Sequence, residues 1–425
     1  GKVKQMITCG IDIGKGKHAA ALLDESGREI GQAKFYDNTR QGAEKLLERL
    51  RRHSDLASVR IGMESTGNYW RAFYDHLTKA GCRVDVINPI ITKASSAGDI
   101  RGRKTDKRDA LTVADVVFRG NYVAKPAENG PERGLKVLTR QRGFLVDECT
   151  AAKLHMLDSL SETFPEFESL FEEKFGNFAL AVLERYPGAH ALAHAHLPSV
   201  MKIVKEHTRG KDVEAEAKKL IDAAKDSICV DCAIHEEIGE CIRSSAKTIR
   251  DLRKRIAEIE KLIEACDPPK VAELIMPIKG SGKLLPKIIA AEIGDIGRFL
   301  HNPKTGATKD MHKRLLAYAG SEPRRRESGK WRGQDFISKR GPGQLRTAGY
   351  LIGNTIRQWD PNFKEVYDRK IAEKKHHNEA VICVFAKLLE VICSLYKTGR
   401  TYTVEKPSAE VINSRKVVNN EASKK

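Results

Sequence analysis

The chain has 425 residues, 31% of them charged and 40% hydrophobic, with a formal net charge of +18. This length allows two or three domains with a sizeable core, and the composition is typical of a globular protein, not a disordered or fibrous one. No signal peptide is visible, and no apolar run approaches the ~20 residues of a membrane-spanning helix, so no membrane partner is expected. The positive charge predicts a polyanionic partner, because Lys and Arg that neutralise phosphates dominate nucleic-acid affinity.

The first 90 residues alternate short apolar runs with amphipathic stretches, which predicts an α/β domain. The expected elements are strands at residues 7–14, 18–24, 29–36, 59–64 and 83–89, and helices at residues 39–53 and 68–81. A further helix is expected to begin near residue 106. The resulting order β-β-β-α-β-α-β-α is that of RNase H-like folds.

Four acidic residues lie in or near the ends of these elements. Asp12 is in the first strand, Glu64 ends the fourth, and Asp106 and Asp109 are three residues apart on one face of the next helix. Two divalent ions about 3.5–4 Å apart need several carboxylates to bridge them and to hold a scissile phosphate. The set therefore predicts a two-metal phosphoryl-transfer site with Mg²⁺ as cofactor, although each acid alone is more often an ordinary residue at a strand end.

Other charged residues near this set have different expected roles. Asp24, in the turn DESG, and Asp115, further along the helix, are expected to lie outside the site. The cations that precede the helix are expected to let phosphates approach the acids; they include Arg101, Arg103 and Lys104. The alternative is a solvated helix N-terminus, which is less favoured because cations are unfavourable at that end of the helix dipole.

Three segments of this region, GIDIGK, MESTGNYW and KTDKRDA, resemble in order and spacing the DEDD-type insertion-sequence transposases. IAAEIGDIGRF, LLAYAGSEPRRRESGKWRG and SKRGPGQLR resemble that family's second conserved block. The expected domains are an α/β RNase H/RuvC-like domain at 1–125, a helical coiled-coil region with an insert at 126–270, a mainly α-helical serine transposase domain at 271–404 and a disordered tail at 405–425.

The resemblance also implies an activity. It implies a DNA transposase or recombinase of a mobile element, nucleoid-associated in the bacterial cytoplasm, that cleaves and exchanges donor and target DNA with Mg²⁺. A nucleophilic serine, a structured guide RNA (a bridge RNA) and a homo-oligomer, dimer or tetramer, are implied as well. Two other functions fit the residues: a hydrolytic RuvC-like nuclease such as a junction resolvase, and a non-catalytic nucleic-acid-binding regulator on a decayed nuclease fold.

Residues 130–268 show little strand signal and predict long helices. Apolar residues recur every seven positions from Leu138 to Ala152, and a second apolar seam with 3-4 spacing runs from Ile242 to Ile263. The two seams predict an antiparallel coiled coil, which could close within one chain or between two protomers.

Residues 165–240 predict a helical insert in which no chemistry is recognisable. Near its end, Cys229, Cys232, His235 and Cys241 could be read as a zinc site. The segment SICVDCAIHEEIGECIRS instead predicts a helix, without the turn that lets Cys-x-x-Cys wrap a metal. The remaining cysteines lie mostly in apolar patterns, which indicates buried, reduced thiols in place of a disulfide framework.

The segment MPIKGSGKLLPKIIAAEIG predicts two helices joined by a tight Gly-x-Gly turn. Such a turn is either a helix-hairpin-helix, which offers backbone N–H groups to a DNA phosphate, or a plain connection between helices. The spacing of its glycines is not that of a P-loop.

Positive charge is concentrated further on, where residues 301–350 contain 12 Lys or Arg against 4 Asp or Glu, a net +8. This distribution argues against a purely solubilising role for the charge. The nucleic-acid contacts expected here are Arg324, Arg325, Arg326, Lys330, Arg332, Lys339 and Arg340.

Ser328 lies in the middle of these cations, which could hold a scissile phosphate and stabilise the pentavalent state. From the residues alone, a Ser-Gly turn in a basic DNA-binding loop is the favoured interpretation, because such turns are common. The resemblance implies that Ser328 is the nucleophile, and Ser281, Ser321 and Ser338 are the competing serines.

Overall fold

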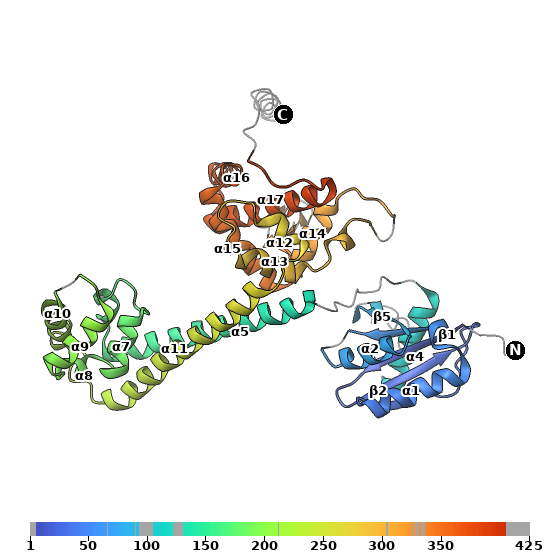
Figure 1. Cartoon of the computed structure of the whole chain (residues 1–425), viewed down its shortest axis with the longest axis horizontal. Coiled ribbons are helices and arrows are strands. Elements are labelled where there is room, and N and C mark those ends of the chain that lie inside the picture. Colours follow the sequence, from blue (N-terminus) through green and yellow to red (C-terminus); the bar gives the residue numbers. More distant parts are fainter. Residues whose placement is uncertain are drawn as a thin grey trace, which may run out of the picture. The chain divides into compact units, whose positions relative to one another are not determined.

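The computed structural model describes residues 6–65, 67–89, 91–92, 105–120, 122, 131–210, 212–302, 305–324, 327–328, 331–332 and 336–404. The tail expected after residue 404 lies outside the described residues. The chain divides into two compact units, residues 1–128 and residues 129–425, each with its own hydrophobic core (Figure 1).

The first unit is built on a five-stranded mixed sheet. Its strands are β1 (Ile7–Ile13), β2 (Lys17–Leu23), β3 (Lys34–Asp37), β4 (Val59–Glu64) and β5 (Arg83–Ile87), in the order β3-β2-β1-β4-β5. The first three strands are antiparallel, whereas β4 and β5 run parallel to β1. This is the expected RuvC-like arrangement, so the predicted fold class is confirmed. The third strand is shorter than predicted, because Glu29 forms only an isolated bridge with Leu23 and regular pairing begins at Lys34.

Helices cover both faces of the sheet. They are α1 (Arg40–His53), α2 (Trp70–Lys79) and α4 (Asp106–Arg119), with a short 3-10 turn, η1 (Leu56–Ser58), before β4. Thr39 begins α1 by accepting a hydrogen bond from the Gly42 N–H at 3.1 Å, and Leu46, Leu47 and Leu50 then bury its apolar face. The helices α1 and α2 share one core with the sheet, while α4 packs on β1, β2 and β4 through Ala110 and Val113.

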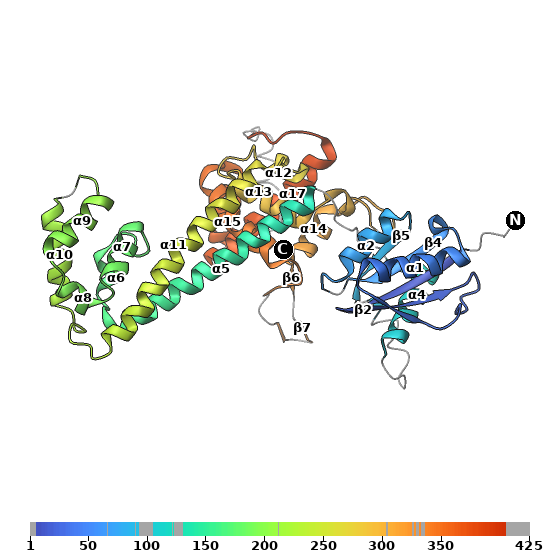
Figure 2. The same ribbon diagram turned by 60° about the horizontal axis from the view of Figure 1, so that its bottom comes forward.

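Two long helices form a stalk in the second unit. The helices α5 (Pro131–Thr163) and α11 (His235–Ala265) pack against each other along their length within this chain (Figure 2). Leu145, Cys149 and Met156 of α5 bury the predicted seam against residues such as Ile249 of α11. At 1.5 Å per residue each helix is about 50 Å long. The predicted pairing of the two helices is confirmed.

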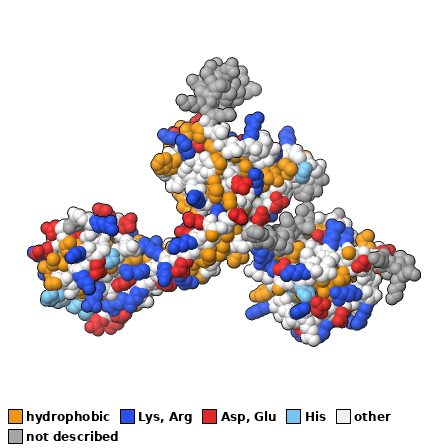
Figure 3. All heavy atoms as spheres, in the orientation of Figure 1, with side chains coloured by type: hydrophobic (Ala, Val, Ile, Leu, Met, Phe, Trp, Pro, Cys, Tyr) orange, Lys and Arg blue, Asp and Glu red, His pale blue; other side chains and the backbone are white. Residues whose placement is uncertain are grey.

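The insert is a small helical domain at one end of the stalk. It consists of α6 (Phe167–Leu170), α7 (Asn177–Arg185), α8 (Ala189–Ala193), α9 (Leu197–His207) and α10 (Val213–Lys225). Acidic and basic side chains are interspersed on its surface (Figure 3). Neither sign dominates the visible face.

The segment that holds Cys229 and Cys232 is not helical, so that part of the prediction is wrong. Residues 227–234 form turns and α11 begins only at His235. Tertiary contacts hold this segment. The Glu166 carboxylate accepts hydrogen bonds from Ser227 Oγ at 2.7 Å and from the Ile228 N–H at 3.2 Å. In the described part of the chain, no three His, Cys, Asp or Glu side chains are placed to hold a metal ion.

The other end of the stalk joins a mainly α-helical C-terminal region. Its helices are α12 (Lys270–Ile275), α13 (Leu284–Ile293), η2 (Ile296–Phe299), α14 (Met311–Ala319), α15 (Gly343–Trp359), α16 (Pro361–Ala372) and α17 (His377–Thr398). Buried Lys287 of α13 donates three hydrogen bonds, at 2.6–3.0 Å, to carbonyl oxygens at the end of α11. Fully buried Glu292 pairs with Arg140 of α5 at 2.8 Å. Because α13 bonds to both stalk helices, the stalk and the C-terminal region form one body.

No helix in the described ranges combines the length and apolar character that crossing a membrane requires.

Candidate functional site

The four predicted acids meet where β1, β4 and α4 come together. Ile11 of β1 is in parallel register with Met63 of β4, so the residues that follow them, Asp12 and Glu64, are neighbours at the same edge of the sheet. Asp106 and Asp109 occupy the first turn of α4, which begins after Thr105. The Thr105 hydroxyl accepts from the Arg108 N–H at 3.4 Å and thus caps the helix.

Two glycines allow α4 to lie directly on the sheet beside these acids. Gly10 and Gly62 are register partners on the sheet face that also carries Asp12 and Glu64. A Cβ atom on Gly10 would lie 2.1 Å from the Ala114 nitrogen and 2.2 Å from a carbonyl oxygen of α4. On Gly62 it would lie 2.2 Å from a side-chain methyl of the same helix. The absence of these side chains therefore sets how closely the α4 carboxylates approach those of the sheet.

The electrostatics of Asp12 show that the four carboxyl groups are neighbours. The pKa of Asp12 is raised to about 6; burial is the largest cause, and the negative charges of Asp109, Asp106 and Glu64 contribute after it, in that order. A hydrogen bond from the Ile13 backbone opposes the increase without cancelling it. Like charges gathered in a half-buried site are a typical signature of a functional site.

Carboxylate oxygens are chemically suitable ligands for a divalent cation. Mg²⁺ prefers hard oxygen ligands, and a cation would relieve the repulsion that raises the pKa of Asp12. As they stand, no three acidic side chains of the described residues enclose an ion. The Glu64 carboxylate is held by a different partner, since its Oε2 accepts from Thr92 Oγ1 at 3.1 Å.

Asp24 and Asp115 have structural roles away from this site. The Asp24 carboxylate accepts from the backbone N–H groups of Ser26 and Arg28 and so holds the β2–β3 turn. Asp115 pairs with Arg119 one turn along α4 at 2.9 Å.

Ser328 lies on an arm of four two-residue strands in the C-terminal region. In this arm, β6 (Pro323–Arg324) pairs with β9 (Phe336–Ile337), and β7 (Glu327–Ser328) pairs with β8 (Trp331–Arg332), both antiparallel. The backbone of Ser328 is opposite Trp331. The sequence predicted a loop here, and the structure instead shows strand pairing.

The expected nucleic-acid contacts are only partly described. Arg324 and Arg332 lie on the strands of the arm, and Lys339 and Arg340 are exposed where it returns to the helices. The other expected contacts lie outside the described residues: Arg101, Arg103, Lys104, Arg325, Arg326 and Lys330.

The base of the arm is tightly built, a feature that sequence reasoning missed. Arg346 of α15 donates to the carbonyl oxygen of Gly341 at 2.6 Å and to that of Ala319 at 3.3 Å, so it ties the two ends of the arm together. A Cβ on Gly341 would lie 1.9 Å from the backbone carbonyl oxygen of Tyr318. An Arg next to two closely spaced glycines (GPGQLR) was the signal that could have indicated this clamp.

The competing serines are poorly placed to attack a phosphate. Ser281 is buried and its hydroxyl lies 3.3 Å from the Met276 carbonyl oxygen, while Ser321 is 4% exposed. The hydroxyl oxygen of Ser338 is also buried. A nucleophile must reach its substrate, so this burial counts against Ser281, Ser321 and Ser338.

The predicted Gly-x-Gly turn joins α12 to α13. Gly280 and Gly282 have positive φ angles of 84° and 65°, which glycine adopts at little cost. A Cβ on Gly280 would lie 2.8 Å from Cδ1 of Trp359 in α15, so the turn rests on that helix. Lys279 and Lys283 are exposed on either side. Phosphate binding by this turn remains a prediction.

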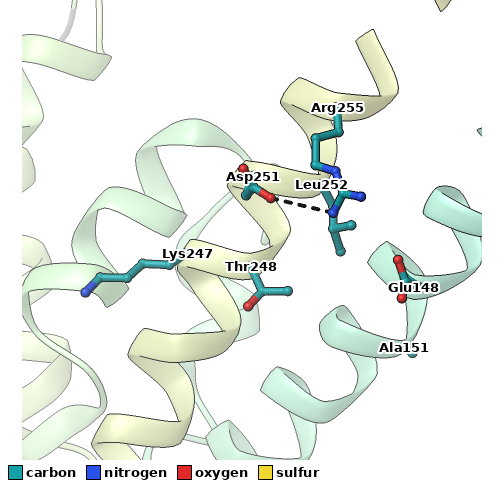
Figure 4. A pocket seen from close by; sticks show the side chains of 7 residues that line it. All are labelled: Glu148, Ala151, Lys247, Thr248, Asp251, Leu252 and Arg255. Carbon is teal, nitrogen blue, oxygen red and sulfur yellow. Dashed lines mark ion pairs between the residues drawn. The ribbon is translucent and has the colours of Figure 1, made fainter. Parts of the chain in front are cut away.

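The stalk carries a shallow groove. It lies between α5 and α11 and is lined by Glu148, Ala151, Lys247, Thr248, Asp251, Leu252 and Arg255 (Figure 4). Asp251 and Arg255 pair across one turn of α11 at 3.9 Å. We assign no chemistry to this groove.

Comparisons with known proteins agree with this geometry. The profile of the IS110-type DEDD transposases matches residues 9–165, and that of the transposase IS116/IS110/IS902 family matches residues 272–368. The 42 kDa protein of insertion element IS900 from Mycobacterium paratuberculosis is 26% identical over 94% of this chain and 97% of its own length. The pilin gene-inverting protein of Moraxella bovis is 22% identical over 92% and 96%.

A solved structure also matches part of this chain. RuvC of T. thermophilus, solved in complex with a Holliday junction substrate, is 17% identical over 29% of this chain and 99% of that chain, with a TM-score of 0.22. The insert lies between the two matched profiles, which end at residue 165 and resume at residue 272. With both profiles matched in order and relatives aligned over nearly the whole length, the chain belongs to the IS110/IS900 family of insertion-element transposases.

Proposed function

We propose that this transposase cleaves and exchanges DNA strands with Ser328 as its nucleophile and Mg²⁺ bound by Asp12, Glu64, Asp106 and Asp109. The observation that carries the metal part is the gathering of the four carboxyl groups at the junction of β1, β4 and α4, where burial and then the charges of the other three raise the pKa of Asp12 to about 6. When bound, the cation supplies positive charge for the scissile phosphate.

The residues around that position each have a defined task. Asp12 and Glu64 present their oxygens from adjacent strands, and the glycines beneath α4 fix the distance to Asp106 and Asp109. Four carboxylates alone would repel a phosphate, so DNA is held mainly by Lys and Arg. Twelve such residues between 301 and 350, against four acids, supply that attraction.

The covalent step is a transesterification. The Oγ of Ser328 forms a bond to phosphorus while the bond from phosphorus to the 3′ oxygen breaks, and the proton that Oγ loses is balanced by the one the 3′ oxygen gains. The product is a phosphoserine linkage and a free 3′-hydroxyl. Attack of a 3′-hydroxyl on the partner's phosphoserine reverses the step and joins the exchanged strands.

Assembly and guidance complete the proposal. The acids and Ser328 belong to different units of the chain, so one phosphate must engage both, within one protomer or between protomers of a dimer or tetramer. Val137, Phe144, Leu154 and Leu262 of the stalk are each more than half exposed, which supports association of copies. Guidance by a structured RNA rests on the family resemblance, and nuclease-treated protein that still recombines specific sites would contradict it.

A denaturing gel of protein mixed with end-labelled DNA, Mg²⁺ and the RNA encoded beside the gene tests the proposal. We expect a covalent protein–DNA band that needs both the metal and Ser328. Cleavage without such a band would favour the hydrolytic nuclease, and binding without cleavage would favour the non-catalytic regulator.

A further inference from the structure

Thr92, a buried residue just beyond β5, contacts the acid site without belonging to the acid set. Its side chain is 6% exposed, and its Oγ1 lies 3.1 Å from Oε2 of Glu64. The same Oγ1 lies 3.0 Å from the carbonyl oxygen of Pro89. Among the hydrogen bonds described for the four acids, this is the one in which a side-chain hydroxyl reaches a carboxylate oxygen.

The hydroxyl has one proton, so it can donate to only one of these two oxygens at a time. A bond to an ionised carboxylate is stronger than one to a neutral carbonyl, which favours donation to Glu64. That bond fixes the position of Oε2 and so orients the carboxylate group. The Pro89 carbonyl remains within reach whenever the carboxylate takes a different partner, so the buried hydroxyl need not lose all its hydrogen bonds.

Backbone hydrogen bonds fix the distance between the two residues. The Ser65 N–H, next to Glu64, donates to the Ile87 carbonyl oxygen at 3.1 Å and ties the end of β4 to the end of β5. The Ile91 N–H donates to the Asn88 carbonyl oxygen at 2.9 Å and forms the turn that leads to Thr92. The hydroxyl is thus held beside the acid by the sheet itself.

We propose that Thr92 is a positioning residue that holds the Glu64 carboxylate ready for a divalent cation. The role rests on the proposed metal-dependent function. A Glu side chain has several rotatable bonds, and a hydrogen bond that fixes one of its oxygens lowers the entropy cost of orienting the carboxylate toward an ion. Partners that orient metal ligands in this way typically contribute 10–100-fold to metal affinity or activity.

Calorimetric titration of the full-length protein with Mn²⁺ alone, without DNA, tests this role. Thr92→Val keeps the shape of the side chain and removes the hydroxyl, whereas Thr92→Ser keeps the hydroxyl. We expect the dissociation constant to rise about 10–100-fold in Thr92→Val and to stay within about threefold of wild type in Thr92→Ser. Thr112→Val is the matched control, because the Thr112 hydroxyl of α4 donates to the Arg108 carbonyl oxygen.

Cleavage assays give a second readout that a purely structural defect would not reproduce. In Thr92→Val the metal concentration for half-maximal cleavage should rise, while the rate at saturating metal should remain near that of wild type. Equal losses in the Val and Ser variants, or unchanged Mn²⁺ affinity in Thr92→Val, would overturn the role of Thr92 alone. A wild-type protein that binds no Mn²⁺ would overturn the proposed metal site and this role with it.

Discussion

The acid site and the serine arm solve the problem of placing reactive groups in different ways. The acids stand on strands of six or seven residues and on a capped helix. Glycines in the strands let that helix lie close to the sheet. Ser328 stands on a two-residue strand, and Arg346 donates hydrogen bonds to Ala319 and Gly341 at the base of the arm. The proposed metal ligands are preorganised by the sheet, whereas the proposed nucleophile is carried on a short ladder of strands.

The largest effect should follow from removing an acid. Asp12→Ala is expected to lower strand cleavage by about a thousandfold or more, because charge stabilisation by a bound metal contributes several kcal/mol to the transition state. Asp115→Ala, which breaks only the pair with Arg119, should cleave like wild type. Cleavage rates on end-labelled DNA at saturating Mg²⁺ give the comparison. Full activity in Asp12→Ala would remove that residue from the site.

Ser328→Ala should distinguish the role of the serine arm from that of the acid site. Recombination and the covalent adduct should vanish together, while Mn²⁺ affinity is unchanged and the free energy of unfolding shifts by no more than about 0.5 kcal/mol. Ser338→Ala, in which a buried hydroxyl is lost, should retain the adduct. An adduct that persists in Ser328→Ala would transfer the nucleophile to another serine.

Gly10→Ala tests whether the close approach of α4 builds the acid site. A methyl group 2.1 Å from the backbone of α4 should force the helix away and reduce the free energy of unfolding of the first unit by about 3 kcal/mol. Metal affinity should fall with it. Gly16→Ala, with open space around the added Cβ, is the control for thermal unfolding and Mn²⁺ titration. Equal stability of the two variants would show that the sheet tolerates a looser α4.

Charge reversal on the arm should affect DNA binding more than chemistry. Arg324→Glu with Arg326→Glu should weaken DNA binding, and the slope of log affinity against log salt should decrease by about 0.9 for each DNA phosphate that the protein no longer neutralises. Fluorescence anisotropy between 50 and 200 mM salt, roughly the range in which such ion pairs dominate, measures this slope. An unchanged slope would place the DNA-binding surface elsewhere.

The smallest effect concerns pH. The pKa of Asp12 is about 6 in the folded protein against an ordinary value of 3.8, so the folded state holds this proton more tightly than the unfolded state. Its contribution to stability is therefore full below about pH 4 and is lost as pH rises through 6. Asp12→Asn should flatten that part of the stability profile of metal-free protein, measured by urea unfolding. A profile of the same slope in both proteins would contradict the raised pKa.

Much of the first unit followed from local patterns in the sequence. Apolar alternation predicted the strands, and the three-residue spacing of Asp106 and Asp109 placed both on one helix face, because these periodicities depend on backbone geometry alone. The identity of the four acids as a set came from their order and from the resemblance. The positions of Gly10 and Gly62 gave no local signal, since their role exists only once two parallel strands bring them side by side beneath α4.

The parts that tertiary contacts decided are the ones that prediction missed. Residues 227–234 have a helical pattern, yet Glu166, more than sixty residues earlier, binds their N-terminal end and turns the chain. Arg346 and Thr92 likewise act through groups that are distant in sequence, the carbonyl oxygen of Ala319 and the carboxylate of Glu64. The sequence by itself determined the elements, the charge and the candidate chemistry. Only the folded chain decided which side chains meet, because a hydrogen bond between distant residues leaves no periodic trace in either segment.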